Sequence, residues 1–265
     1  MTALLPNWED KIMNLFRKNE VTFAIVLIVI YVVGNSICQS VSETIGIEFL
    51  AETVFCIIMS AAVYIFIKRS NLSEYLGMKK PEISVSRMLF YIPFILIGGV
   101  GAFFGMGLAY SPFICIIRAV MMICVGFLEE VIFRGFLFRG IAKSNLTEAV
   151  VISSVTFGIG HIVNLLNGYD VINNIIQIIF AVGVGFLLVF TFLRTSSIVP
   201  CILFHAFNNA INAFITKDFL IEKIGETNAD MIVMFIKMAL IIVYLIYIIK
   251  LPKKELPEKS YSVNG

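Results

Sequence analysis

Hydrophobic residues fall in long runs along this chain, and polar or charged residues gather between the runs. A helix needs about 20 mostly apolar residues to cross the hydrocarbon core of a bilayer. Eight runs are candidates for such a crossing: 21–40, 47–67, 88–108, 112–141, 148–167, 171–193, 196–215 and 230–250. The pattern predicts an all-α, polytopic membrane protein of about eight transmembrane helices. The run at 112–141 exceeds one crossing, which predicts a tilted helix or one that extends into water.

Composition supports this fold class and excludes one class of partner. Hydrophobic residues make up 59% of the chain and charged residues 14%, and the mean hydropathy is +0.95. A soluble domain carries roughly a quarter charged residues. The net charge is only +2, and no Lys/Arg cluster is interleaved with aromatic residues. We therefore expect no nucleic-acid partner. The expected partner is the lipid bilayer.

The same pattern predicts how the chain is divided. Residues 21–250 are expected to form one transmembrane domain, because no internal repeat and no Gly/Ser-rich linker separates its runs. Apolar residues recur at helical spacing within residues 1–20, which predicts an interfacial helix; a disordered tail is the alternative. Residues 251–265 are polar, which predicts a tail without fixed structure.

Basic residues predict the orientation. With the N-terminus inside, sixteen of the 20 Lys and Arg residues fall in cytoplasmic segments, and only Lys217 and Lys223 fall in outside loops. An excess of Lys and Arg marks the cytoplasmic side of a membrane protein. Both termini are therefore expected in the cytoplasm.

Two adjacent acids, Glu129 and Glu130, interrupt the fourth run. Ionisable side chains at membrane depth are costly and by default indicate function. On a helix the two point about 100° apart, and Arg134 lies on the face of Glu130, four residues later. We expect Glu130 to pair with Arg134 and Glu129 to point into the bundle as a general base. The alternative is that both acids belong to structural ion pairs.

The two histidines, His161 and His205, are the only ones in the chain, and both lie in apolar runs. Around His161, Gly158 and Gly160 leave room for a neighbouring helix or a substrate. The alternative is a neutral histidine satisfied by one hydrogen bond between helices.

His205 begins a polar stripe that continues with Asn208, Asn209 and Asn212. Such a stripe must face the bundle or a water-filled cavity. Since His and Asn side chains can donate hydrogen bonds to an oxyanion, His205 and Asn209 are candidate site residues. We expect Asn208 and Asn212 to form hydrogen bonds between helices.

Three short motifs occur in order on consecutive hydrophobic runs: EEVIFR at 129–134, FGIGH at 157–161 and HAFNN at 205–209. In the forms EExxxR, FxxxH and HxxxN they resemble the CPBP family of intramembrane endopeptidases, also called the Abi or CAAX-protease family. The motifs cover 129–209 directly, and the family-like core is expected over about 112–215. The runs before 112 and the last run lie outside the recognised pattern.

The resemblance implies a hydrolytic site inside a helical bundle, acting on a membrane-associated peptide or protein. Carried over by position, Glu129 and His161 activate water, and His205 and Asn209 stabilise the oxyanion. Glu130 and Arg134 support the site.

The resemblance leaves the cofactor open. Glu129, His161 and His205 offer a His₂Glu set that is acceptable for catalytic zinc. No HExxH motif occurs, however, and the three residues come from separate helices. A Glu–His pair can hold a water molecule without a metal, and we favour this metal-free reading.

The sequence is compatible with more than one function. The Ile-, Phe- and Asn-rich usage is typical of an AT-rich bacterium, which favours the bacterial cell membrane and a bacteriocin-like or signalling peptide as substrate. A non-catalytic regulatory or immunity protein is the main alternative. A proton-coupled transporter would use similar buried groups but lacks the expected repeat.

Overall fold

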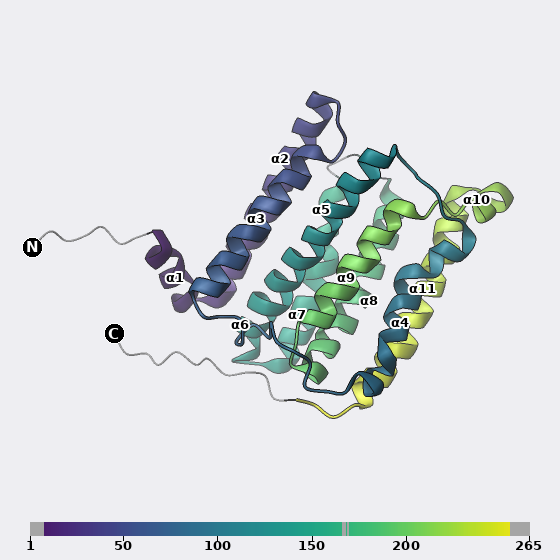
Figure 1. Ribbon diagram of the computed structural model, residues 1–265. Helices are drawn as coiled ribbons and strands as arrows, with labels where there is room; N and C mark the ends of the chain where they lie inside the picture. Colours follow the sequence, from purple (N-terminus) through teal and green to yellow (C-terminus); the bar gives the residue numbers. More distant parts are fainter. Residues whose placement is uncertain (1–7, 166–167, 169, 255–265) are drawn as a thin grey trace, which may run out of the picture.

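The computed structural model describes residues 8–165, 168 and 170–254, and Figure 1 shows them as a bundle of helices. No strand occurs in these residues; a single antiparallel bridge joins Met106 to Ile215. The helices are α1 Trp8–Lys18, α2 Glu20–Ile45, α3 Leu50–Arg69, α4 Ile92–Gly99, α5 Pro112–Glu130, α6 Arg139–Ala142, α7 Leu146–Ile159, α8 Val171–Thr195, α9 Val199–Ile211, α10 Asp218–Ile224 and α11 Glu226–Lys250. Shorter or irregular helical segments are η1 Val85–Tyr91, η2 Val100–Phe104, η3 Val131–Phe138, η4 Gly160–Leu165 and η5 Asn212–Phe214.

The predicted fold class, an all-α polytopic membrane protein, is confirmed, but the predicted number of spans is one too high. In the described part of the chain, seven helical stretches are long and apolar enough to cross a membrane. The predicted span at 196–215 is not among them, because α9 has only 13 residues and the adjoining η5 adds only 3. At 1.5 Å per residue α9 and η5 together are roughly 24 Å long, short of the approximately 30 Å hydrocarbon core. The long fourth run is one continuous stretch, Pro112–Ala142, of 31 residues.

Local sequence signals fix several helix ends. Asn19 caps α2 by accepting a hydrogen bond from the backbone N–H of Thr22 at 2.9 Å. Asn145 caps α7 in the same way. These side chains satisfy backbone donors that have no partner within the helix. At the other end of α2, Gly46 adopts a left-handed φ of 77°, which glycine tolerates without strain.

Close backbone approach joins α5 to α9. A Cβ placed on Gly126 of α5 would lie 2.6 Å from the backbone nitrogen of Ala206 and 2.8 Å from its Cα. Only a residue without a side chain fits there. The helix of Glu129 and Glu130 therefore lies directly against the helix of His205, and α3 covers another side of α5.

Gly126→Ala is expected to destabilise the bundle by about 1–3 kcal/mol, because the added methyl group forces α5 and α9 apart. Thermal unfolding of the purified protein in detergent measures the effect. Gly99→Ala is the matched control, since a Cβ on Gly99 would meet nothing within 4 Å. Equal unfolding midpoints for the two variants would contradict this account of the contact.

The N-terminal helix is attached to the bundle. Phe16 of α1 is fully buried and makes edge-to-face contacts with Phe23, Tyr75 and Phe136. Residues 1–7 of the predicted interfacial segment and 255–265 of the predicted tail lie outside the described residues.

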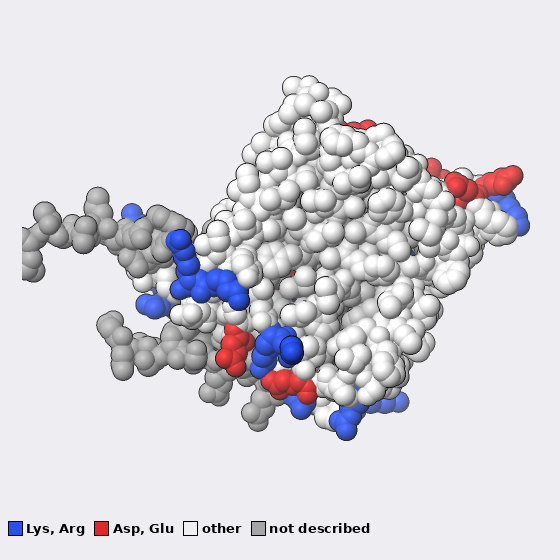
Figure 2. Space-filling view, viewed as in Figure 1, with Lys and Arg blue, Asp and Glu red and all other residues white. Residues whose placement is uncertain are grey.

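Charged side chains gather at the two ends of the molecule. Figure 2 shows an uncharged belt over the helices, Lys and Arg together with some Asp and Glu at the end where α1 lies, and a second group of acidic and basic side chains beside α10. The belt supports an integral membrane protein. The cytoplasmic placement of both termini stays a prediction.

Candidate active site

The C-terminal end of α5 carries the two acids, and the helix continues without a break into η3. Segment η3 is a π-helix over Val131–Phe138. Such wider turns are rare within α-helices and are frequent at functional sites. No pattern in the sequence predicted it. Glu129, Glu130 and Arg134 all lie at or next to this irregular stretch.

The predicted contact between Glu130 and Arg134 is confirmed. One guanidinium nitrogen of Arg134 lies 3.0 Å from Oε1 of Glu130, and both side chains are fully buried. Another nitrogen donates to the carbonyl of Gly185 at 3.3 Å, and the guanidinium carbon lies 4.2 Å from the ring centre of Phe157. Arg134 thus links α5 and its continuation to α7 and α8.

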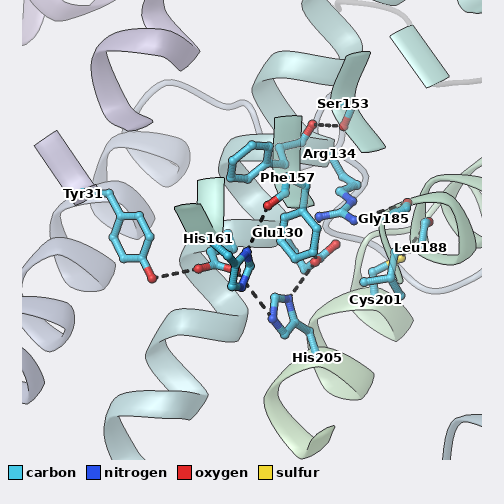
Figure 3. Close-up of polar contacts among 12 residues, drawn as sticks. Tyr31, Glu130, Arg134, Ser153, Phe157, His161, Gly185, Leu188, Cys201 and His205 are labelled. Carbon is cyan, nitrogen blue, oxygen red and sulfur yellow. Dashed lines mark hydrogen bonds and ion pairs between the residues drawn. The ribbon is translucent and has the colours of Figure 1, made fainter. Parts of the chain in front are cut away.

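Glu130 has a second partner that the sequence did not reveal. Nδ1 of His205 lies 2.8 Å from the same oxygen, Oε1, of Glu130. The opposite ring nitrogen, Nε2, lies 3.6 Å from Oε2 of Glu129. His205 therefore bridges the two carboxyls, one through each nitrogen (Figure 3). The longer distance exceeds a direct hydrogen bond but lies within the range of an ion pair when the ring is protonated.

Glu129 also has a partner outside the motifs. The hydroxyl of Tyr31, on α2, donates a buried hydrogen bond to Oε1 of Glu129 at 2.9 Å. Sequence reasoning missed Tyr31. The only available signal was a phenol in an apolar run, since the phenol needs a hydrogen-bond partner when it is buried.

His161 is half-buried on η4, the continuation of α7. Its Nδ1 lies 3.2 Å from the carbonyl oxygen of Phe157, and its own carbonyl accepts a hydrogen bond from Asn174 at 2.9 Å. The Phe157 ring makes edge-to-face contacts with His161 and with His205, at 5.8 and 5.5 Å between ring centres. Within the described residues, no direct hydrogen bond or ion pair joins His161 to Glu129, and their joint action on water stays a prediction.

The asparagine side chains that follow His205 form hydrogen bonds along their own helix. Asn208 is buried and donates to Oδ1 of Asn209 at 3.1 Å, and Asn212 donates to the carbonyl of Asn208. The prediction that Asn208 and Asn212 donate hydrogen bonds between helices is therefore wrong, because a backbone or side-chain acceptor lies within reach on the same helix. Asn209 accepts the bond from Asn208 through its Oδ1. Its NH₂ group, which can donate, lies on the opposite side of the amide from this oxygen.

The candidate zinc ligands, Glu129, His161 and His205, lie on three separate helical segments, α5, η4 and α9. Among the described residues, no group of three or more His, Cys, Asp or Glu side chains is placed to hold a metal ion. This finding includes Glu129, His161 and His205. Nδ1 of His205 lies 2.8 Å from Oε1 of Glu130. The metal-free interpretation and the zinc alternative both stay predictions.

Comparison with known proteins concerns the segment that carries the three motifs. Residues 110–211 match the family model described as Type II CAAX prenyl endopeptidase Rce1-like. No curated protein and no solved structure matches the chain. The matched segment includes Glu129, Arg134, His161 and His205, whereas Tyr31 lies outside it. Residues 110–211 are therefore a domain of the CPBP family of intramembrane endopeptidases, the family to which the three motifs pointed.

Proposed function

We propose that this chain is an endopeptidase that hydrolyses a peptide bond of a membrane-associated peptide or protein within its helical bundle. The observation that supports it most is the position of His205 between Glu130, at 2.8 Å, and Glu129, at 3.6 Å. These groups come from two helices of the family-matched segment. A carboxylate that can act as a base and an oriented imidazole on one small site can together catalyse the hydrolysis of an amide.

In the proposed reaction, Glu129 removes a proton from a water molecule that His161 helps to hold. The resulting hydroxide oxygen bonds to the scissile carbonyl carbon, and the carbonyl oxygen becomes the oxyanion. Glu129 then returns the proton to the amide nitrogen as the C–N bond breaks, so that an acid and an amine leave. The carboxylate ends each cycle as it began.

His205 and Asn209 stabilise the oxyanion in this proposal. An ionised Glu130 beside Arg134 can only accept hydrogen bonds, so Nδ1 of His205 must carry a proton. Nε2 donates to the oxyanion when the ring carries both protons, and the NH₂ group of Asn209 supplies a second donor. Glu130 and Arg134 support the site by fixing His205.

Hydrolysis is expected to continue after metal removal, because the proposed steps use only protein side chains. Purified protein is dialysed against a strong chelator, its metal content is measured, and peptide cleavage is assayed before and after. Loss of cleavage that returns on adding one equivalent of zinc would contradict the metal-free reading.

The natural substrate we propose is a bacteriocin-like or signalling peptide, processed or neutralised at a bacterial cell membrane with both termini of the enzyme in the cytoplasm. The test uses proteoliposomes with two probes, a peptide ending in a farnesylated CAAX sequence and a set of unmodified membrane-spanning peptides. Mass spectrometry identifies new peptide ends. Cleavage of the unmodified peptides by the wild type and not by Glu129→Gln supports the proposal.

The alternative is a non-catalytic membrane protein that acts by binding a regulatory or immunity partner. Intact probes with the wild type, together with a cellular phenotype that Glu129→Gln leaves unchanged, would favour this alternative.

A further inference from the structure

We infer that Tyr31 is a positioning residue for Glu129, contributed by a helix outside the family-matched segment. This inference rests on the proposed function, because it assigns Tyr31 an effect through the proposed base. The observation behind it is the buried hydrogen bond from the Tyr31 hydroxyl to Oε1 of Glu129 at 2.9 Å.

The two oxygens of Glu129 face different helices. Oε1 accepts the hydroxyl of Tyr31 from α2, and Oε2 lies 3.6 Å from Nε2 of His205 on α9. The last torsion of a glutamate side chain is broad and roughly two-fold, so packing alone does not fix the plane of its carboxylate. The Tyr31 bond fixes that plane and keeps the other oxygen toward His205. Orientation of this kind is a recognised part of catalytic preorganisation.

Helix α2 is itself held in register for this contact. Tyr31, Asn35 and Ser42 lie near one face of α2, at spacings of four and seven residues. Sγ of Cys56, on α3, lies 3.8 Å from Oδ1 of Asn35. The hydroxyl of Ser42 donates to buried Glu52 and accepts from the backbone N–H of Ala51 at 2.9 Å. Three polar contacts along one helix therefore set both the rotation and the height of Tyr31.

Tyr31→Phe removes the hydroxyl and keeps the ring. We expect kcat for the cleaved probe peptide to fall roughly 10- to 100-fold, the effect of losing a hydrogen bond to a charged group. KM should stay unchanged, because Tyr31 contacts Glu129 rather than substrate.

Tyr75→Phe is the matched control. The Tyr75 hydroxyl also donates a buried hydrogen bond to a glutamate, Glu20, at 2.6 Å, but Glu20 is not part of the site. The expected result is an unchanged kcat. An equal loss of kcat in Tyr31→Phe and Tyr75→Phe would mean that loosened packing is the cause, and would overturn the inference.

A double variant tests whether Tyr31 acts through Glu129. In Glu129→Asp the shortened carboxylate no longer reaches the phenol, so adding Tyr31→Phe should change the remaining kcat less than about twofold. A further loss as large as that of Tyr31→Phe alone would overturn the inference, because the two residues would then act independently.

A spectroscopic measurement separates failure of this inference from failure of the proposed function. The infrared difference between ¹³C-glutamate-labelled wild type and Glu129→Gln identifies the band of the Glu129 carboxyl without any substrate. Tyr31→Phe should shift this band and Tyr75→Phe should not. An unshifted band overturns the Tyr31 contact, whereas full cleavage by Glu129→Gln overturns the proposed function.

Discussion

Glu129→Gln is expected to lower kcat for peptide cleavage by about 10²- to 10⁴-fold, the contribution of a positioned general base. Glutamine keeps the shape of the side chain and an oxygen that can still accept the Tyr31 hydroxyl at the position of Oε1. It cannot take a proton from water. The measurement is the initial rate in proteoliposomes, with the unfolding midpoint determined on the same preparation.

Glu52→Gln is the control for this variant. Glu52 is also buried in a membrane-spanning helix and also accepts a hydroxyl hydrogen bond, from Ser42. It lies outside the site, and glutamine keeps an oxygen that can accept the Ser42 hydroxyl, so the contact that holds α2 persists and kcat should stay unchanged. If Glu129→Gln retained the wild-type rate, Glu129 could not be the base.

Arg134→Leu is expected to cost about 3–5 kcal/mol of stability, the largest effect on folding that we predict. The guanidinium is fully buried, and its removal leaves the carboxylate of Glu130 without its cationic partner. Chemical denaturation in detergent micelles measures the loss. Arg118→Leu is the comparison: Arg118 lies over the rings of Phe49 and Tyr110, and its loss should cost less.

A second substitution separates stability from catalysis in this pair. Replacing a buried ion pair by apolar groups is often neutral for stability. Glu130→Leu combined with Arg134→Leu should therefore recover much of the lost stability. Cleavage should stay low, because Nδ1 of His205 has lost its acceptor. Recovery of both properties would contradict the supporting role of Glu130.

The membrane spans could be predicted because bilayer thickness imposes a length on every apolar run. The prediction was wrong for 196–215, where composition was apolar enough but the helix is short. There Ser196 adopts a left-handed conformation after α8, and α9 begins only at Val199. The helix lies against α4, α5 and α8, so its neighbours cover it and it need not span the core alone.

Within the site, spacing along one helix predicted the Glu130–Arg134 contact, since residues four apart share a face. Contacts between helices could not be predicted this way. The bonds from His205 to Glu130 and from Tyr31 to Glu129 join residues 75 and 98 positions apart. They depend on how α5 packs against α9 and α2, which the close approach at Gly126 helps to set.

The Glu130–Arg134 pair also bears on how the chain enters the bilayer during synthesis. An Arg or an Asp placed singly at the centre of a helix costs roughly 2.5–3.5 kcal/mol on insertion. Because both partners lie within Pro112–Ala142, they can neutralise each other before any later helix has been made. His205 joins only when α9 emerges, 75 residues after Glu130. The Glu130–Arg134 pair can thus form within one segment of the growing chain, whereas the contacts of His205 with Glu129 and Glu130 can form only after α9 has been made.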